Sequence, residues 1–202
     1  MLLTSVQRDA LTELVNIGFG RAAASLSSLV RQRVYLCAPD VSVYLLPDMQ
    51  AHLSILEPEV ATVHQIFSGQ ISGDALLILE TEGASTLIGL LSDEPTPKVR
   101  LTPSDREALM EVGNILLNAF VGSFGNLLKV HVTFAVPRLR LDAIDDLLNT
   151  LEVGQQEIRY TLLVQTSFTI AESQVQGFVA LVMGIESLDR LFEAMDAAGY
   201  QV

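Results

Sequence analysis

The chain has 202 residues, of which 50% are hydrophobic and 18% are charged, and its formal net charge at pH 7 is −12. A chain of this length and composition can bury a sizeable core, which excludes an intrinsically disordered protein. Its acidity argues against a nucleic-acid partner, because an acidic surface repels the phosphate backbone.

The first half of the chain predicts a long helix, two short strands, a short helix, two longer strands and a final amphipathic helix. The β-branched and alternating residues identify the longer strands, and a proline separates the two short ones. Apart from the short helix, the expected bounds are 4–30 for the long helix, 32–37 and 41–46 on either side of Pro39, 60–67 and 75–79 for the longer strands, and 81–91 for the last helix.

The second half predicts the same series of elements. The expected bounds are 103–128, 130–136 and 138–141 on either side of Pro137, a short helix within 141–151, 158–170, 175–182 and 186–197. Ser104 is the expected N-cap of the long helix, because Glu107 follows three residues later and completes a capping box.

The two halves also resemble each other residue by residue. RDALTELVNI at 8–17 aligns with REALMEVGNI at 106–115, an offset of 98 that also pairs Pro39 with Pro137. QISG at 70–73 resembles QVQG at 174–177 at an offset of 104, which a short insertion near residues 141–151 explains. An internal repeat of this kind indicates two copies of one structural unit.

We therefore expect one domain over residues 1–202, made of two repeats at about 1–97 and 98–202. The polar segment 92–98, with two prolines, is the best boundary. The strands of one repeat alone would leave open edges and an uncovered apolar face. The predicted fold is α+β, with two pseudo-symmetric halves sharing one mainly antiparallel sheet on which the long helices pack.

A polar face recurs on the two long helices. At 100° per residue, Asp9, Glu13 and Asn16 share one side of the first helix, and the opposite side is apolar. The second helix repeats the arrangement with Glu107, Glu111 and Asn114. A single pair of this kind would be an ordinary solvated surface, but Asn is a mediocre helix former and here it recurs at matching positions.

A neighbouring carboxylate and carboxamide suit hydrolysis of a phosphoryl group. The carboxylate can pair with a basic side chain of a partner, and the amide can hold and orient a water molecule. Phosphoryl transfer depends mainly on positioning and charge stabilisation, so it needs no strong nucleophile from this chain.

The spacing of these residues resembles the signature of the CheC-type chemotaxis phosphatases, a family that includes CheC, CheX and FliY. The first copy matches the family pattern completely: Asp9, three residues, Glu13, two residues, Asn16 and then 22 residues to Pro39. The second copy has the same spacing and ends at Pro137, with Glu107 where the family has Asp or Ser. Two copies in one chain resemble CheC, whereas CheX carries one copy and dimerises.

The resemblance implies a phospho-aspartyl protein phosphatase whose substrate is the phosphorylated response regulator CheY. It implies that Glu13 and Glu111 each pair with a lysine of the regulator, and that Asn16 and Asn114 orient the attacking water. Asp9, Pro39, Glu107 and Pro137 are expected to support the motif. No cofactor is expected in this chain, and the resemblance places Mg²⁺ in the regulator. It also suggests a CheD-type deamidase as a partner.

Two other functions stay open on the sequence. Related folds serve as scaffolds in the flagellar switch, so the chain could bind a regulator without hydrolysing its phosphate, or act mainly on a deamidase.

A dinucleotide-binding fingerprint at Gly18-Phe19-Gly20-Arg21-Ala22-Ala23 is not expected to function, because it lies within a helical pattern and lacks the preceding strand. The scattered histidines 52, 64 and 131 do not predict a metal site.

The remaining expectations concern location and the one cysteine. No apolar run reaches the length of a membrane helix and no signal-peptide pattern opens the chain, so we expect a cytoplasmic protein without membrane contact. Cys37 cannot form a disulfide within the chain, which suits a reducing compartment. Because Cys37 lies in an apolar run, we expect a buried, inert thiol. The duplicated design predicts a monomer.

Overall fold

The structure of the chain is a computed structural model that describes residues 3–53, 56, 58–91, 101–152, 159–170 and 173–200. The first half contributes α1 (Ser5–Val30), β1 (Val34–Leu45), a 3₁₀ turn (Leu46–Asp48), α2 (Met49–Leu53), β2 (Glu59–Gly69), β3 (Gly73–Glu80) and α3 (Thr81–Leu91). The second half contributes α4 (Pro103–Leu128), β4 (Val132–Phe134), β5 (Arg138–Ala143), α5 (Ile144–Glu152), β6 (Arg159–Ile170), β7 (Ser173–Gly184) and α6 (Ile185–Ala197). The expected boundary segment, 92–98, lies outside the described residues, so the division into repeats stays a prediction.

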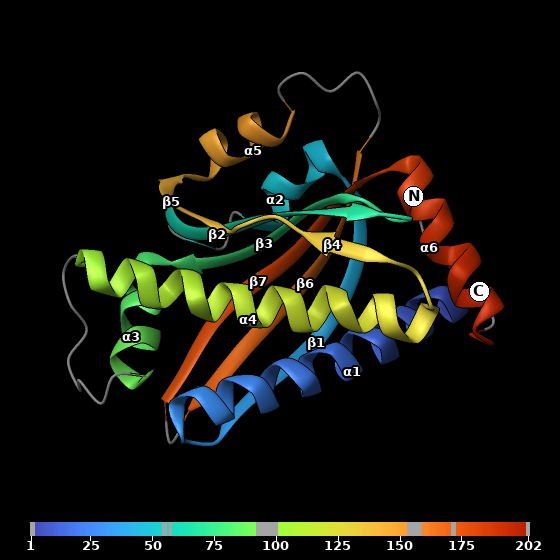
Figure 1. The fold of residues 1–202 in the computed structure, drawn as a ribbon. Coiled ribbons are helices and arrows are strands. Elements are labelled where there is room, and N and C mark those ends of the chain that lie inside the picture. Colours follow the sequence, from blue (N-terminus) through green and yellow to red (C-terminus); the bar gives the residue numbers. More distant parts are fainter. Residues whose placement is uncertain are drawn as a thin grey trace.

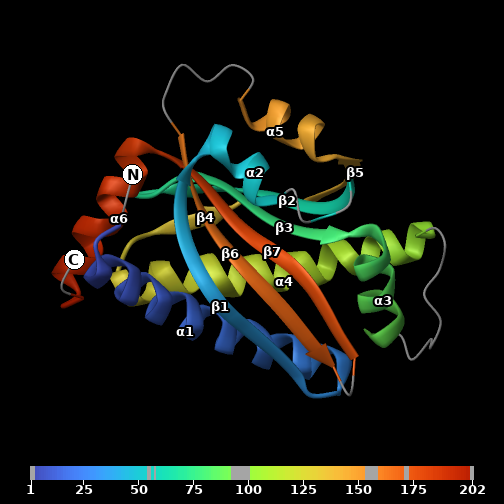
Figure 2. The same ribbon diagram turned by 180° about the vertical axis from the view of Figure 1, so that it is seen from behind.

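The strands form one seven-stranded sheet in the order β1-β6-β7-β3-β2-β4, with β5 also paired to β2. Every strand pair among the described residues is antiparallel. At the middle of the sheet β3 pairs with β7, so one strand from each half meets there, with Leu77 opposite Val179. The predicted α+β fold with a shared antiparallel sheet is confirmed (Figures 1 and 2).

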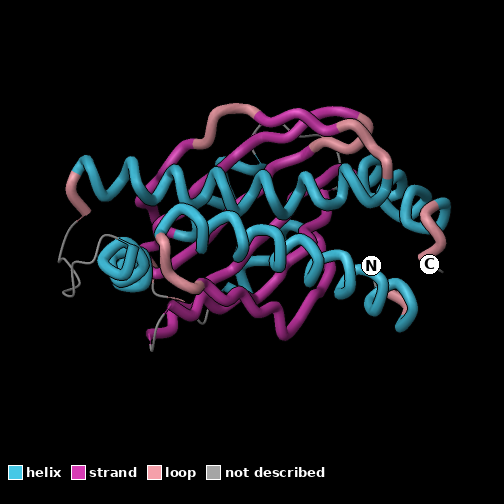
Figure 3. The backbone as a smooth tube through the Cα atoms, turned by 60° about the horizontal axis from the view of Figure 1, so that its bottom comes forward, coloured by secondary structure: helices cyan, strands magenta, loops and turns pink. Residues whose placement is uncertain are grey.

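The helices lie in two layers on the sheet. The long helices α1 and α4 run side by side in opposite directions across one face (Figures 1 and 3), and the main hydrophobic core lies between them and the strands. A smaller core lies on the other face, under α2 and α5. α4 is long and apolar enough by composition to cross a membrane, but half of its most apolar stretch is buried within the structure, as in the core helix of a globular fold.

The two long helices approach each other closely at a glycine. A Cβ added at Gly18 would lie 2.9 Å from the side chain of Phe120 and 3.3 Å from the Phe120 carbonyl oxygen. The rings of Phe19 and Phe120 lie 5.1 Å apart between centroids. Gly18 of the apparent dinucleotide fingerprint therefore serves helix packing, and the whole fingerprint lies within a continuous helix.

Both long helices begin at a threonine rather than at the serine expected for α4. The Thr102 side chain accepts a hydrogen bond from the Asp105 amide at 3.2 Å, and the Asp105 carboxylate accepts one from the Thr102 amide at 2.8 Å. Pro103 takes the first helical position, where its missing N–H costs nothing. The prediction of Ser104 as N-cap was therefore wrong by two residues, while Thr4 caps α1 in the same way.

Two short strands were predicted after each long helix, and the structure differs from this prediction in the first half only. β1 continues from residue 34 to residue 45, with a register shift between Cys37 and Asp40 in place of the expected break at Pro39. A bulge tolerates proline because the ladder is already interrupted there. In the second half β4 and β5 are separate strands, as predicted, with Pro137 between them.

The expectation of a buried Cys37 was also wrong. The thiol is exposed, because β1 is the edge strand of the sheet. Successive side chains alternate between faces, and Cys37 shares its face with Tyr35, which is 55% exposed. An apolar run on an edge strand thus leaves half of its side chains uncovered.

A mostly buried charge cluster ties three strands together on the sheet. Asp74 of β3 accepts a hydrogen bond from His64 of β2 at 2.8 Å and forms an ion pair with Arg159 of β6. Burial opposes ionisation of Asp74, but the hydrogen bonds and charges of His64 and Arg159 outweigh it and hold the pKa of the Asp74 carboxyl below its usual value. His64 therefore has a structural role.

Candidate functional site

The predicted polar faces lie on the outer side of the two long helices. On α1, Asp9, Glu13 and Asn16 are all exposed, while Leu11 and Leu14 on the opposite side are fully buried. Asn16 makes no side-chain hydrogen bond with any residue that the structure describes. The apolar stripe fixes which side of α1 meets the core, and the motif therefore faces outward.

The second copy occupies the matching face of α4, but its asparagine is held differently. Glu107 and Glu111 are exposed, whereas Asn114 is half-buried. The Asn114 Oδ1 atom accepts a hydrogen bond from Gln65 Nε2 at 3.2 Å and one from Asn118 Nδ2 at 2.8 Å. Gln65 comes from β2 and is only 1% exposed, so this carboxamide is anchored to the sheet.

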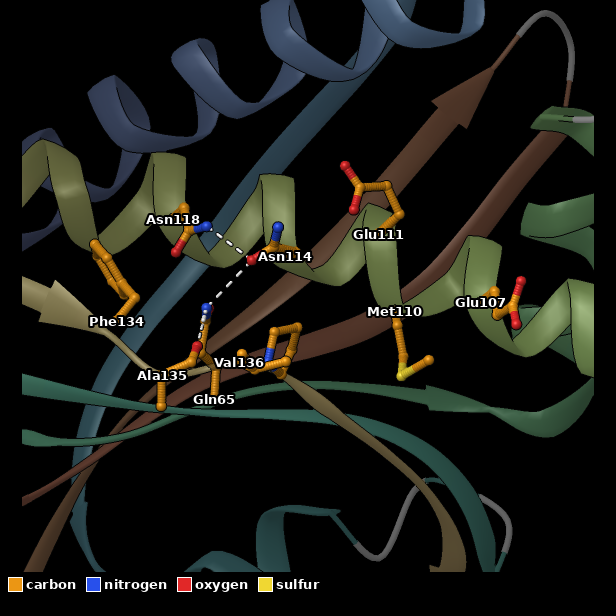
Figure 4. A pocket seen from close by; sticks show the side chains of 10 residues that line it. Gln65, Glu107, Met110, Glu111, Asn114, Asn118, Phe134, Ala135 and Val136 are labelled. Atoms are coloured by element: carbon orange, nitrogen blue, oxygen red, sulfur yellow. Dashed lines mark hydrogen bonds between the residues drawn. The ribbon is translucent and has the colours of Figure 1, made fainter.

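A pocket of about 430 Å³ opens beside this carboxamide. Its walls are α4, β2 and the segment between β4 and β5, as Figure 4 shows. The lining residues are Gln65, Glu107, Met110, Glu111, Asn114, Asn118, Phe134, Ala135, Val136 and Pro137. The break in the strand after α4 thus forms one side of the pocket, and Val136, which is 85% exposed, lies at its edge.

A glycine next to the asparagine brings α4 down onto β2. A Cβ added at Gly113 would lie 2.5 Å from Val63 Cγ1 and 2.7 Å from Val63 Cβ, which is closer than side-chain carbons pack. Without a side chain at residue 113, the helix approaches the strand far enough for Asn114 to reach Gln65. Val15 holds the corresponding position in the first half, at the offset of 98.

The structure therefore brings Glu107, Glu111, Asn114 and Pro137 of the second motif together at one pocket, and it displays Asp9, Glu13 and Asn16 on an open helix face. Pro39 lies within β1, where nothing is described of its side chain. Sequence reasoning missed Gln65, Asn118 and Met110. Asn118 was detectable, since it lies one turn after Asn114 on the same face; Gln65 was not, because it is 49 residues away in a buried strand.

The site is built for hydrogen bonding and charge pairing. Among the described residues, no group of three or more His, Cys, Asp or Glu side chains could hold a metal ion. The chemistry of the second motif is that of a carboxylate and a carboxamide on one helix face, next to a recess that can admit a side chain of a partner.

Comparisons with known proteins agree with the motif. The chain is 22% identical over 202 residues to the CheY-P phosphatase CheC of Bacillus subtilis, covering 95% of each chain. It is 26% identical over 170 residues to the flagellar motor switch phosphatase FliY of Bacillus subtilis, a match that spans 83% of this chain and 43% of that protein. No family model matches the chain.

Solved structures share the fold. The crystal structure of FliY from Thermotoga maritima superposes with a TM-score of 0.80 at 17% identity, covering 98% of this chain and all of that one. FliM of Helicobacter pylori, solved in a FliG–FliM complex, superposes with a TM-score of 0.66 at 14% identity, covering 95% of this chain and all of that one.

The two motif copies and the near full-length similarity to CheC relate the chain to one class of protein, because in both respects it resembles the CheC-type chemotaxis proteins. It is similar to CheC over nearly its whole length and to part of FliY.

Proposed function

We propose that this chain dephosphorylates a CheY-like response regulator, acting as a phospho-aspartyl protein phosphatase in the cytoplasm. The observation that carries the proposal is the Asn114 carboxamide, held at the edge of a pocket with Glu111 exposed one turn earlier on the same helix. The similarity to two proteins named as phosphatases, CheC and FliY, supports the same activity.

In the proposed mechanism the regulator docks its phosphorylated aspartate against α4. The Glu111 carboxylate pairs with a lysine of the regulator and fixes the orientation of the complex. The Asn114 amide holds a water molecule in line with the phosphorus atom. The water oxygen forms a bond to phosphorus and the bond between phosphorus and the aspartyl oxygen breaks. The aspartate is released as a carboxylate, and inorganic phosphate leaves with both protons of the water. The regulator's Mg²⁺ supplies charge stabilisation on the phosphoryl oxygens. Glu13 and Asn16 form the matching pair on α1, where the exposed Asn16 carboxamide lacks the hydrogen bonds that hold Asn114, so we expect the second motif to supply most of the activity.

A scaffold function is the alternative, and one observation favours it. FliM, whose fold this chain shares, is a protein found in complex with FliG. A non-catalytic chain would bind the regulator through the same helix faces, and it would leave the phosphoryl group in place. The recurrence of an asparagine in both motifs favours hydrolysis, since binding alone does not require a carboxamide at both positions.

The test follows loss of phosphate from a phosphorylated regulator in the presence of Mg²⁺. We expect the wild-type chain to accelerate the loss, Asn114→Ala to remove most of the acceleration, and Asn16→Ala with Asn114→Ala to abolish it, since one positioned hydrogen-bonding group contributes about 100-fold to rate. Ser28→Ala, an exposed change at the far end of α1, serves as the control. A wild-type chain that binds the phosphorylated regulator without accelerating the loss would establish the scaffold.

A further inference from the structure

The second motif has a feature that the family signature does not contain, namely two buried or half-buried amides behind its asparagine. We propose that Gln65 of β2 and Asn118 of α4 are positioning residues that hold the Asn114 carboxamide with Oδ1 turned inward and Nδ2 turned to the pocket. The catalytic consequence of this orientation rests on the proposed phosphatase function, whereas the orientation itself does not.

The orientation follows from one atom whose role is unambiguous. The carbonyl oxygen of Ala135 can only accept a hydrogen bond, and Gln65 lies 2.9 Å from it. Gln65 must therefore present its Nε2 group on this side, because its own oxygen would repel the carbonyl. The same Nε2 group lies 3.2 Å from Asn114, so Asn114 must present Oδ1 to it. The backbone between β4 and β5 thereby sets the direction of the Asn114 amide.

Asn118 completes the arrangement from the next turn of the helix. Its Nδ2 group donates to Asn114 Oδ1 at 2.8 Å, and the two donors together occupy both lone pairs of that oxygen. The Nδ2 group of Asn114 points away from both donors, as Figure 4 shows. A water that accepts a hydrogen bond from this group keeps a second lone pair for attack on phosphorus.

This arrangement costs stability, which argues that it is not there for folding. The Gln65 Oε1 and Asn118 Oδ1 atoms are buried and have no hydrogen-bond partner among the described residues. A buried polar atom without a partner destabilises a protein, and an apolar residue at position 65 would fill the same space without that penalty. Polar groups retained at such a cost concentrate at functional sites.

The first motif lacks both positioning residues. At the offset of 98, Gly20 stands where the second half has Asn118, and it has no side chain to donate. Thr166 stands where the first half has Gln65: it lies on β6 between the residues paired with Asp40 and Cys37, opposite the bulge of β1. Gln65 lies likewise between the stretches of β2 paired with β5 and β4. Asn16 is accordingly exposed and free to rotate.

The kinetic test isolates the second motif in an Asn16→Ala background. Gln65→Met keeps the length of the side chain and removes the amide, and Asn118→Ala removes the other donor from a half-buried helix position with little risk to folding. We expect each change to lower kcat for the phosphorylated regulator by about tenfold with KM unchanged, because the loss is one of orientation. In the Asn114→Ala single variant, whose remaining activity comes from the first motif, neither change should have an effect. Full losses in the Asn114→Ala background, or unchanged kcat in both variants, would overturn the proposal.

A second readout does not require activity. In the wild-type chain the side-chain NH₂ group of Asn114 should have a higher NMR order parameter than that of Asn16, and Gln65→Met should lower it to the Asn16 level. Equal mobility of the two groups in the wild-type chain would overturn the proposal. If the wild-type chain releases no phosphate while Asn114 is ordered by Gln65, the proposed function fails and the positioning stands.

Discussion

The close approach of α4 to β2 gives a sharp prediction for Gly113→Ala. The added Cβ would lie 2.5, 2.7 and 2.8 Å from three side-chain carbons of Val63, so the helix must withdraw by about 1 Å to restore ordinary contact. Rotation of the Val63 side chain cannot relieve the contact, because the Val63 Cβ atom itself lies 2.7 Å away and does not move with χ1. Overpacking of this kind costs about 1–3 kcal/mol, and the better helix propensity of Ala returns up to about 1 kcal/mol. The expected net loss is about 1–2 kcal/mol.

The same movement should weaken the second motif. The hydrogen bond from Gln65 to Asn114 is already 3.2 Å long, and a withdrawal of about 1 Å takes it beyond hydrogen-bonding distance. Activity of the second motif should therefore fall together with stability, which a phosphate-release assay in the Asn16→Ala background measures.

Gly122→Ala on the same helix is the matched control, because a Cβ there meets nothing within 4 Å. It should be neutral or stabilising by up to about 1 kcal/mol, as expected from helix propensity alone. Thermal unfolding then compares the two variants, and Gly113→Ala should melt roughly 5 °C lower than the wild type. Equal stability of the two variants would refute the close contact between α4 and β2.

Three further outcomes follow from the described contacts. Asp74→Asn should lower the free energy of unfolding by about 3 kcal/mol at pH 7, because it leaves the Arg159 charge mostly buried without its partner. Because the pKa of Asp74 is lowered from 3.8, the difference between the variant and the wild type should be constant above pH 3.8 and should disappear as the pH falls further. Urea unfolding measures this difference, and one that persists in acid would contradict the prediction. Thr102→Ala should lower the free energy of unfolding by about 1 kcal/mol and Ser104→Ala by less than about 0.5 kcal/mol, as measured by chemical denaturation. The opposite ranking would show that Ser104 is the N-cap. Cys37 should react with a thiol reagent in the folded chain, and protection until unfolding would place it in the core instead.

The features that the sequence predicted well are those set by local pattern. The 3.6-residue period of the long helices fixed which side of each faces the core, so the outward positions of Glu13 and Glu111 could be predicted. The alternation of the longer strands and the antiparallel sheet followed in the same way, because the two halves carry the same pattern.

The features that it missed depend on tertiary contacts. Pro39 and Pro137 occupy matching positions, yet the first lies in a bulge of a continuous strand and the second lies between two strands. The contact of Gln65 with Asn114 joins a buried strand to a helix, and nothing within either segment indicates it. The different surroundings of Asn16 and Asn114 are invisible in a motif that both halves share.

Multiple turnover is the most direct test of the proposed phosphatase activity. A trace of the wild-type chain, mixed with a large excess of phosphorylated CheY-like regulator and Mg²⁺, should release many phosphates per molecule, and the Asn16→Ala, Asn114→Ala double variant should release none above the spontaneous rate. Binding of the regulator by the wild-type chain with no release above that rate would contradict phosphatase activity and identify the chain as a scaffold.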